Sequence, residues 1–144
     1  MRDLRRLKRL THLKTRLRDA VRANLAQADQ ALQQSQQLEA DAERVYAEAI
    51  SETTQAGETP AHTLWARAER ATRGQLDVRQ AAAVVVTRVE AREGVQAELR
   101  EAQREMKAME LLTQRERLAR RIRREQAEQL ITDEVVASKR SRST

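Results

Sequence analysis

The chain has 144 residues, a net charge of +6 and 35% charged residues, whereas aromatic residues make up only 1%. Phenylalanine and cysteine are absent, and alanine is the commonest apolar residue. So few bulky side chains cannot offset the ordering entropy of a compact globular core, and the lack of cysteine excludes disulfides and thiolate metal sites. The composition is typical of long helices and coiled coils, with disorder as the alternative for so polar a chain.

The first predicted element is a helix over about residues 2–54. Apolar residues recur along it every three or four positions, which is the spacing of a coiled-coil seam, and leucines continue the stripe toward the N-terminus. We therefore expect this face to pack against another helix. The stripe consists of Leu4, Leu7, Leu10, Leu13, Leu17, Val21, Leu25, Ala28, Leu32, Ser35, Leu38, Ala42, Val45 and Ala49.

A turn is predicted at about residues 55–59, because Gly57 and Pro60 stand together there among good helix formers. Gly57 suits a left-handed backbone at the end of the first helix. Thr59 is the expected N-cap of the second helix, with Pro60 at the first helical position, where its missing N–H costs nothing. The expected fold is therefore all-α, a long antiparallel two-helix coiled-coil hairpin.

The second predicted helix covers about residues 60–137, and a disordered tail is expected at 138–144. Gly74 and Gly94 lie inside this helix, where they mark a bend or a close contact, or are tolerated surface glycines. The predicted seam changes phase near Gly94. It consists of Leu64, Ala68, Ala71, Gln75, Val78, Ala82, Val85, Val89, Leu99, Ala102, Met106, Met109 and Leu112.

Residues 81–86 are apolar on every side of the helix, whereas a two-helix hairpin hides only one side. A surplus stripe of Trp65, Leu76, Ala83 and Val86 is then left facing outward. This stripe is either a binding surface for a partner or a second copy, or part of a locally bulkier seam or a short strand.

The two helices differ in length, so the second one should extend beyond the first. If residue i lies opposite residue 116 − i, Leu4 meets Leu112, and the residues after about Thr113 form a C-terminal helical overhang. This overhang is either a solvated helix or an anchoring site on another protein. Its arginines are Arg115, Arg117, Arg120, Arg121, Arg123 and Arg124.

Basic residues concentrate at both ends of the chain. The net charge is +7 over residues 1–22, −6 over 23–63, +1 over 64–110 and +4 over 111–144. A hairpin would bring the two basic segments together, and the resulting charge asymmetry would orient the molecule as it approaches a charged partner.

Few residues suit catalysis or metal binding. His12 and His62 stand apart from any carboxylate cluster at ligand spacing, and the three glycines are too isolated for a phosphate-binding loop. We therefore assign no catalytic, cofactor-binding or metal-binding residue and expect a protein that is not an enzyme. No apolar run approaches the roughly 20 residues that span a bilayer, and no secretory signal is evident, so a cytoplasmic location is expected.

The opening sequence Leu4-Arg5-Arg6-Leu7-Lys8-Arg9-Leu10 resembles the start of stalk proteins of type III secretion systems, the FliJ/YscO family. The pattern in that family is Leu-x-Arg-apolar-Lys-x-Leu on a basic first helix. The length, the high pI, the mid-chain break between two long helices, Trp65 soon after that break and the charged overhang also resemble the family. This resemblance implies a hairpin like the γ-subunit coiled coil of the F1 ATPase, placed in the central pore of the hexameric export ATPase.

The resemblance also implies partners and site residues. Family members contact the export ATPase, the export-gate membrane protein and export chaperones, at a cytoplasmic position beside a membrane-embedded secretion apparatus. The family's gate-contact stripe falls near Ala71, Gln75, Val78 and Ala82 and lacks the family's aromatic residue here. The implied ATPase-ring contact comprises Arg5, Arg6, Lys8, Arg9, Arg117, Arg120, Arg121 and Arg124. The candidate contact with the gate or a second copy comprises Trp65, Leu76, Val78, Ala82 and Val86.

Three other functions fit parts of the sequence. The arginines of residues 115–124 could neutralise nucleic-acid phosphates, although no aromatic residues accompany them for stacking. Residues 2–22 could lie on anionic lipid without inserting into the membrane, although the hairpin would bury the same leucines. A homodimeric coiled coil could form through Val84 and Val86.

Overall fold

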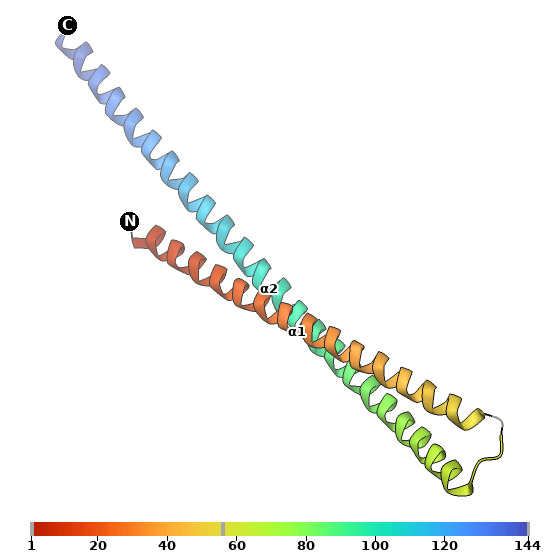
Figure 1. Ribbon diagram of the computed structural model, residues 1–144. Helices are drawn as coiled ribbons and strands as arrows, with labels where there is room; N and C mark the ends of the chain where they lie inside the picture. The colour runs from red at the N-terminus through yellow and green to blue at the C-terminus, as the bar shows by residue number, and fades with distance from the viewer. Residues whose placement is uncertain (1, 56, 144) are drawn as a thin grey trace. The chain divides into compact units, whose positions relative to one another are not determined.

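The computed structural model describes residues 2–55 and 57–143, and within these ranges it contains α1 (Arg2–Thr54) and α2 (Ala61–Arg142) (Figure 1). The helices pack against each other in opposite directions, and the described residues contain no strand. The predicted all-α helical hairpin is therefore confirmed. The contacts divide the chain into two compact units: unit 1, Met1–Arg18 with Glu101–Thr144, and unit 2, Asp19–Arg100.

The turn in unit 2 departs from the predicted capping by one residue. Gly57 has a positive φ, of 152°, but α1 already ends at Thr54, so Gly57 does not close the helix as predicted. In the first turn of α2, the backbone amides of Thr63 and Leu64 donate to the carbonyl oxygen of Pro60, at 3.0 Å and 3.1 Å. Pro60 therefore occupies the cap position. The Thr59 hydroxyl instead donates to the carbonyl oxygen of Gly57 at 3.5 Å. A residue before proline avoids the helical region, which keeps Thr59 outside the helix.

An arginine from α2 closes the C-terminal end of α1. Arg67 Nη1 donates to the backbone carbonyl oxygen of Glu52 at 3.1 Å, and Arg70 Nη1 lies 2.7 Å from Glu52 Oε2. Carbonyl groups in the last turn of a helix lack helical partners and attract cations. Glu52 therefore ties the end of α1 to the first turns of α2.

The seam of unit 2 follows the predicted stripe over most of its length. Buried or half-buried positions of α1 include Val21, Leu25, Ala28, Leu32, Ser35, Ala42 and Ala49, and those of α2 include Ala71, Val78, Ala82, Val85 and Val89. Next to the turn, however, the inward positions of α2 are Thr63, Arg67 and Gly74 rather than Leu64, Ala68 and Gln75. Leu38 and Val45 are 65% and 50% exposed, with Glu39 and Tyr46 half-buried beside them.

The seam of unit 1 differs from the prediction more strongly. Leu10, Leu13 and Leu17 are 39%, 51% and 48% exposed, and the half-buried positions are those directly after them, Thr11, Lys14 and Arg18. On α2 the inward position is likewise one residue later than predicted. Leu112 is 48% exposed, whereas Thr113 is buried, with 9% exposed. The polar groups are satisfied in place, since the Thr11 hydroxyl donates to the carbonyl of Leu7 and Lys14 pairs with Glu105 across the helices.

Interhelical pairs show that the predicted register was wrong by about one helical turn. Lys14 pairs with Glu105 in unit 1, and Asp29 with Arg92 and Glu52 with Arg70 in unit 2, so the paired residue numbers add to 119, 121 and 122. Residue i therefore lies opposite about residue 120 − i, not 116 − i. In unit 2 the residue opposite Thr54, where α1 ends, is therefore about residue 66, and α2 has already begun at Ala61.

The overhang begins later in the sequence than predicted, and its last residues are helical rather than disordered. Every described side chain from Arg121 to Ser143 is exposed, so the segment that α1 does not cover begins at about residue 121 rather than at about 114. α2 continues to Arg142 through the segment predicted to be a disordered tail. Lys139, Arg140 and Arg142 occupy its last turn, where positive charge interacts favourably with the helix dipole.

Candidate functional site

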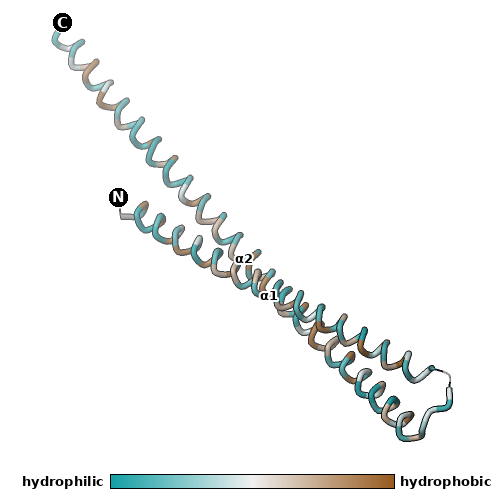
Figure 2. Tube along the Cα trace, viewed as in Figure 1, coloured by the Kyte–Doolittle hydropathy of each residue, from teal (hydrophilic) through white to brown (hydrophobic). Residues whose placement is uncertain are grey.

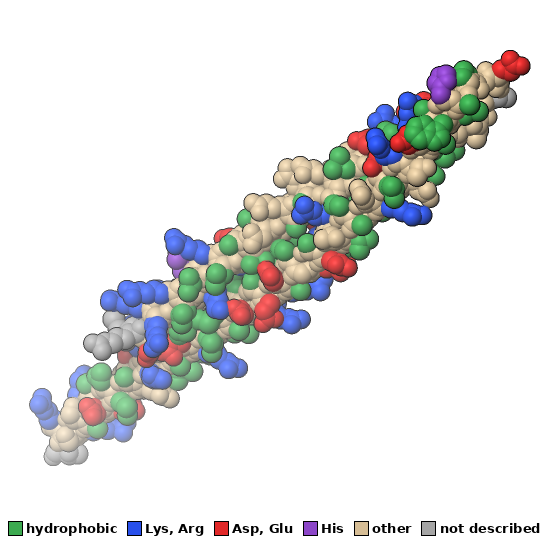
Figure 3. All heavy atoms as spheres, turned by 90° about the horizontal axis from the view of Figure 1, so that it is seen from below, with side chains coloured by type: hydrophobic (Ala, Val, Ile, Leu, Met, Phe, Trp, Pro, Cys, Tyr) green, Lys and Arg blue, Asp and Glu red, His purple; other side chains and the backbone are tan. Residues whose placement is uncertain are grey.

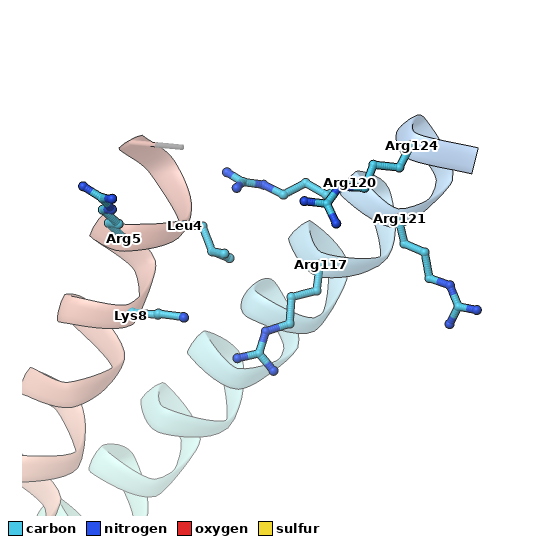
Figure 4. Close-up of a pocket in the computed structure, with 7 residues that line it drawn as sticks. All are labelled: Leu4, Arg5, Lys8, Arg117, Arg120, Arg121 and Arg124. Atoms are coloured by element: carbon cyan, nitrogen blue, oxygen red, sulfur yellow. The ribbon is translucent and has the colours of Figure 1, made fainter. Parts of the chain in front are cut away.

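The most distinctive site in unit 1 is a basic groove between the N-terminal turns of α1 and the α2 segment after Thr113. Its open volume is about 530 Å³. Figure 4 shows Leu4 and Lys8 of α1 pointing toward α2, and Arg117 pointing into the space between the helices, whereas Arg121 points away from α1. The lining residues are Leu4, Arg5, Lys8, Arg117, Arg120, Arg121 and Arg124.

Two of the groove arginines are paired with glutamates of their own helix. Arg120 Nε lies 3.0 Å from Glu116 Oε1, with both side chains less than a third exposed, and Arg121 Nε lies 2.9 Å from Glu125 Oε1. Within the described parts of the chain, no carboxylate pairs with the other four basic residues of the groove. The groove therefore presents uncompensated positive charge around the apolar side chain of Leu4.

The charge of the whole of unit 1 reinforces that of the groove. Unit 1 has 19 basic and 9 acidic residues, a net charge of +10, whereas unit 2 has 9 basic and 13 acidic residues, a net charge of −4. A surface of this kind attracts anions and acidic partners over a distance of about the Debye length, ~8 Å at physiological salt. Unit 1 is therefore the part of the chain best suited to an acidic partner.

Six of the eight basic residues assigned to a ring contact from the sequence line this one groove. Arg6 and Arg9 do not line it, although both are exposed on α1. Leu4 lines the groove and was not among the predicted contacts; its place at the start of the leucine stripe was the available signal.

The second set of predicted contact residues falls in unit 2 and is divided between two faces of α2. Trp65, Leu76 and Val86 are 70%, 53% and 58% exposed. Val78 and Ala82 are half-buried on the seam that faces α1. Trp65, Leu76 and Val86 are therefore the members of this set that a partner can reach without separating the helices.

Apolar side chains other than the predicted ones are also exposed in unit 1. Leu10, Leu13 and Leu17 lie on one face of α1, at spacings of three and four. Figure 2 shows apolar and polar positions interspersed along both helices, and Figure 3 shows hydrophobic side chains exposed between basic ones. The apolar spacing predicts these three leucines in the seam, and that prediction is wrong.

The chemistry available to the described residues is limited. They contain no group of three histidine, cysteine, aspartate or glutamate side chains placed to hold a metal ion. Neither helix, over the residues described, has a stretch long and apolar enough to cross a membrane. No protein-family model matches the chain, and comparisons with curated proteins and with solved structures also give no match.

Proposed function

We propose that this chain is the non-catalytic stalk of a type III secretion export apparatus, which inserts into the hexameric export ATPase and links it to the export gate. The observation that carries the proposal is the basic groove, which gathers Arg5 and Lys8 of α1 with four arginines of α2. The resemblance of residues 4–10 to the FliJ/YscO stalk proteins supplies the identity of the partner.

The fold supports a stalk in two physical respects. Each unit is two helices wide, about 20 Å, a size suited to the central pore of a ring. The positive charge is also unevenly distributed, because unit 1 carries +10 and unit 2 carries −4. A stalk that contacts six subunits unequally favours different conformations in them, since a ligand shifts conformational states through its differential affinity. No catalytic group is needed for this role.

The gate contact is assigned to the exposed residues of the second predicted set. Trp65, Leu76 and Val86 recur at intervals that place them on one side of α2, away from the half-buried seam residues Val78 and Ala82. An exposed apolar stripe of this kind is suited to a protein partner. Export chaperones are further proposed partners, and the proposed location is the cytoplasmic face of the secretion apparatus.

The test is retention of the full chain by a purified hexameric export ATPase. Replacing Arg117, Arg120 and Arg121 by glutamate should weaken retention at least about tenfold, because attraction in the groove becomes repulsion. A matched control replaces three exposed arginines of unit 2, Arg73, Arg79 and Arg100, by glutamate and should retain the ATPase. Equal retention of both variants, or no retention of the unaltered chain, would reject the proposal.

Nucleic-acid binding is a second candidate, favoured by the net charge of +10 in unit 1. The aromatic residues Tyr46 and Trp65 both lie in unit 2, so no base-stacking side chain accompanies the groove. Any binding would thus depend on phosphate contacts and fall steeply with salt. An electrophoretic shift of RNA or DNA that persists at physiological salt, without ATPase retention, would favour this candidate over the stalk.

A further inference from the structure

A row of leucines on α1 is left without a partner in unit 1. Leu10, Leu13 and Leu17 follow one another at i, i+3 and i+7, which places them on one face of the helix. Their exposures of 39%, 51% and 48% show that α2 does not cover them. An apolar row that the fold leaves open requires an explanation outside the hairpin.

Basic residues surround this leucine row. Arg6 lies four residues before Leu10 on the same face, and Arg9 and Arg16 each directly precede a leucine of the row; all three are exposed. Among the described residues, no carboxylate forms an ion pair with any of these three arginines. The face therefore combines apolar side chains with uncompensated positive charge.

We infer that the face of α1 bearing Leu10, Leu13 and Leu17 binds the surface of an anionic lipid bilayer, with the helix lying along the surface. Interfacial helices bury an apolar face about 5–10 Å into the headgroup region while flanking lysines and arginines contact anionic lipids. The net charge of +10 on unit 1 complements the negative potential of such a membrane. No membrane-spanning segment is needed for this contact.

The geometry favours a bilayer over an acidic protein helix as the occupant. A partner helix is usually held in a groove. The groove of unit 1 is lined by Leu4, Arg5, Lys8 and arginines of α2, and Leu10, Leu13 and Leu17 are not part of it. The row of leucines comes from one helix and projects from its side, which matches a deformable planar surface.

This contact is separate from the proposed ATPase contact, because the leucine row and the groove have no residue in common. Both sites belong to unit 1, so a membrane-bound chain would hold its basic groove close to the membrane. The inference goes beyond the proposed stalk function and does not depend on the identity of the groove's partner.

The test is cosedimentation of the full chain with vesicles of phosphatidylcholine, with and without phosphatidylglycerol. Binding is expected only with phosphatidylglycerol, and replacing both Leu13 and Leu17 by glutamine should weaken it about tenfold or more, because buried apolar area drives insertion. The matched control replaces Leu38 and Val45 of unit 2, which are 65% and 50% exposed, by glutamine. This control variant should bind the vesicles as strongly as the unaltered chain does.

A fluorescence measurement distinguishes insertion from adsorption by charge alone. In a Trp65→Phe background, Leu13→Trp should shift its emission to shorter wavelength with phosphatidylglycerol vesicles, whereas Leu38→Trp should not. Vesicle binding that is unaffected by Leu13→Gln with Leu17→Gln would overturn the inference.

Two further outcomes separate this inference from the stalk proposal. In the first, the unaltered chain fails to bind vesicles of either composition while the double variant Leu13→Gln with Leu17→Gln abolishes ATPase retention. In that case the leucine row is a protein contact and the lipid inference is wrong. If vesicle binding follows the leucines but the ATPase is not retained, the lipid inference stands and the stalk proposal fails.

Discussion

Gly74 of α2 lies directly against Tyr46 of α1, so closely that a Cβ atom on Gly74 would be 3.2 Å from the tyrosine Cδ2 and 3.5 Å from its Cβ. The two residue numbers add to 120, close to the sums of 121 and 122 that the interhelical ion pairs of unit 2 give. Gly74 is thus a close-approach glycine, one of the alternatives that the sequence left open.

The first prediction uses this contact to test the register. Cysteines replacing Tyr46 and Gly74 should form an intramolecular disulfide under mild oxidation, because a Cβ separation of 3.5 Å falls within the range of about 3.5–4.5 Å that disulfides adopt. The chain has no other cysteine to compete. Mass spectrometry of the oxidised monomer measures the yield.

The control for this prediction pairs Tyr46→Cys with Arg70→Cys, the partner in the register of 116 that the sequence suggested. Arg70 lies one turn from Gly74 and should give little disulfide. Faster oxidation of the Tyr46/Arg70 pair than of the Tyr46/Gly74 pair would contradict the register described above.

The second prediction concerns the two glycines inside α2. Gly94→Ala should raise the free energy of unfolding by about 1 kcal/mol, because alanine is the better helix former and the new methyl group meets nothing within 4 Å beyond its own stretch of helix. Gly74→Ala should gain less or lose stability, because its methyl group meets the Tyr46 side chain and backbone. Thermal unfolding followed by circular dichroism measures both, and an equal gain would show that the contact is loose.

The sequence predicted the hairpin well because helix formers and a single Gly-Pro break leave few alternatives. The seam was harder to assign at its ends. Leu10, Leu13 and Leu17 continue the apolar spacing but stand one position before the residues that face α2. In unit 1, Lys14 occupies an inward position and is satisfied by its ion pair with Glu105. Periodicity alone could not detect that ion pair.

The third prediction concerns the closure of α1 by α2. Arg67→Gln should lower the free energy of unfolding by about 1–2 kcal/mol, because a partly buried cation loses its hydrogen bond to the carbonyl of Glu52. Arg70→Gln should cost less than about 1 kcal/mol, because its ion pair with Glu52 is exposed. Urea unfolding at low and high salt separates them; a larger loss for Arg70→Gln would contradict this ranking.

The candidate groove was predictable in its residue types but not in its geometry. The sequence identified basic residues at both ends of the chain, and the hairpin brings six of them to one groove. Arg6 and Arg9 fall outside it because they project from other sides of α1 than Leu4 and Lys8 do. Which arginines of α2 lie opposite Leu4 and Lys8 depends on the register of the two helices. The register predicted from the sequence differs from the observed one by about one helical turn.

The fourth prediction removes the carboxylate that compensates Arg120. Glu116→Gln should strengthen ATPase binding by about two- to fivefold at low salt, because the groove gains one uncompensated positive charge. Glu98→Gln, which makes the same change at an exposed position of unit 2, should have no effect. Titration with the labelled chain at two salt concentrations measures the difference. Weaker binding by Glu116→Gln would mean that the groove charge does not drive the contact.

The stoichiometry of the complex tests the central claim most directly. A single central pore has room for one hairpin two helices wide, so light scattering of the isolated complex should give one copy of this chain for six ATPase subunits. One copy per ATPase subunit, or a hexamer that excludes the chain, would contradict the assignment as a stalk.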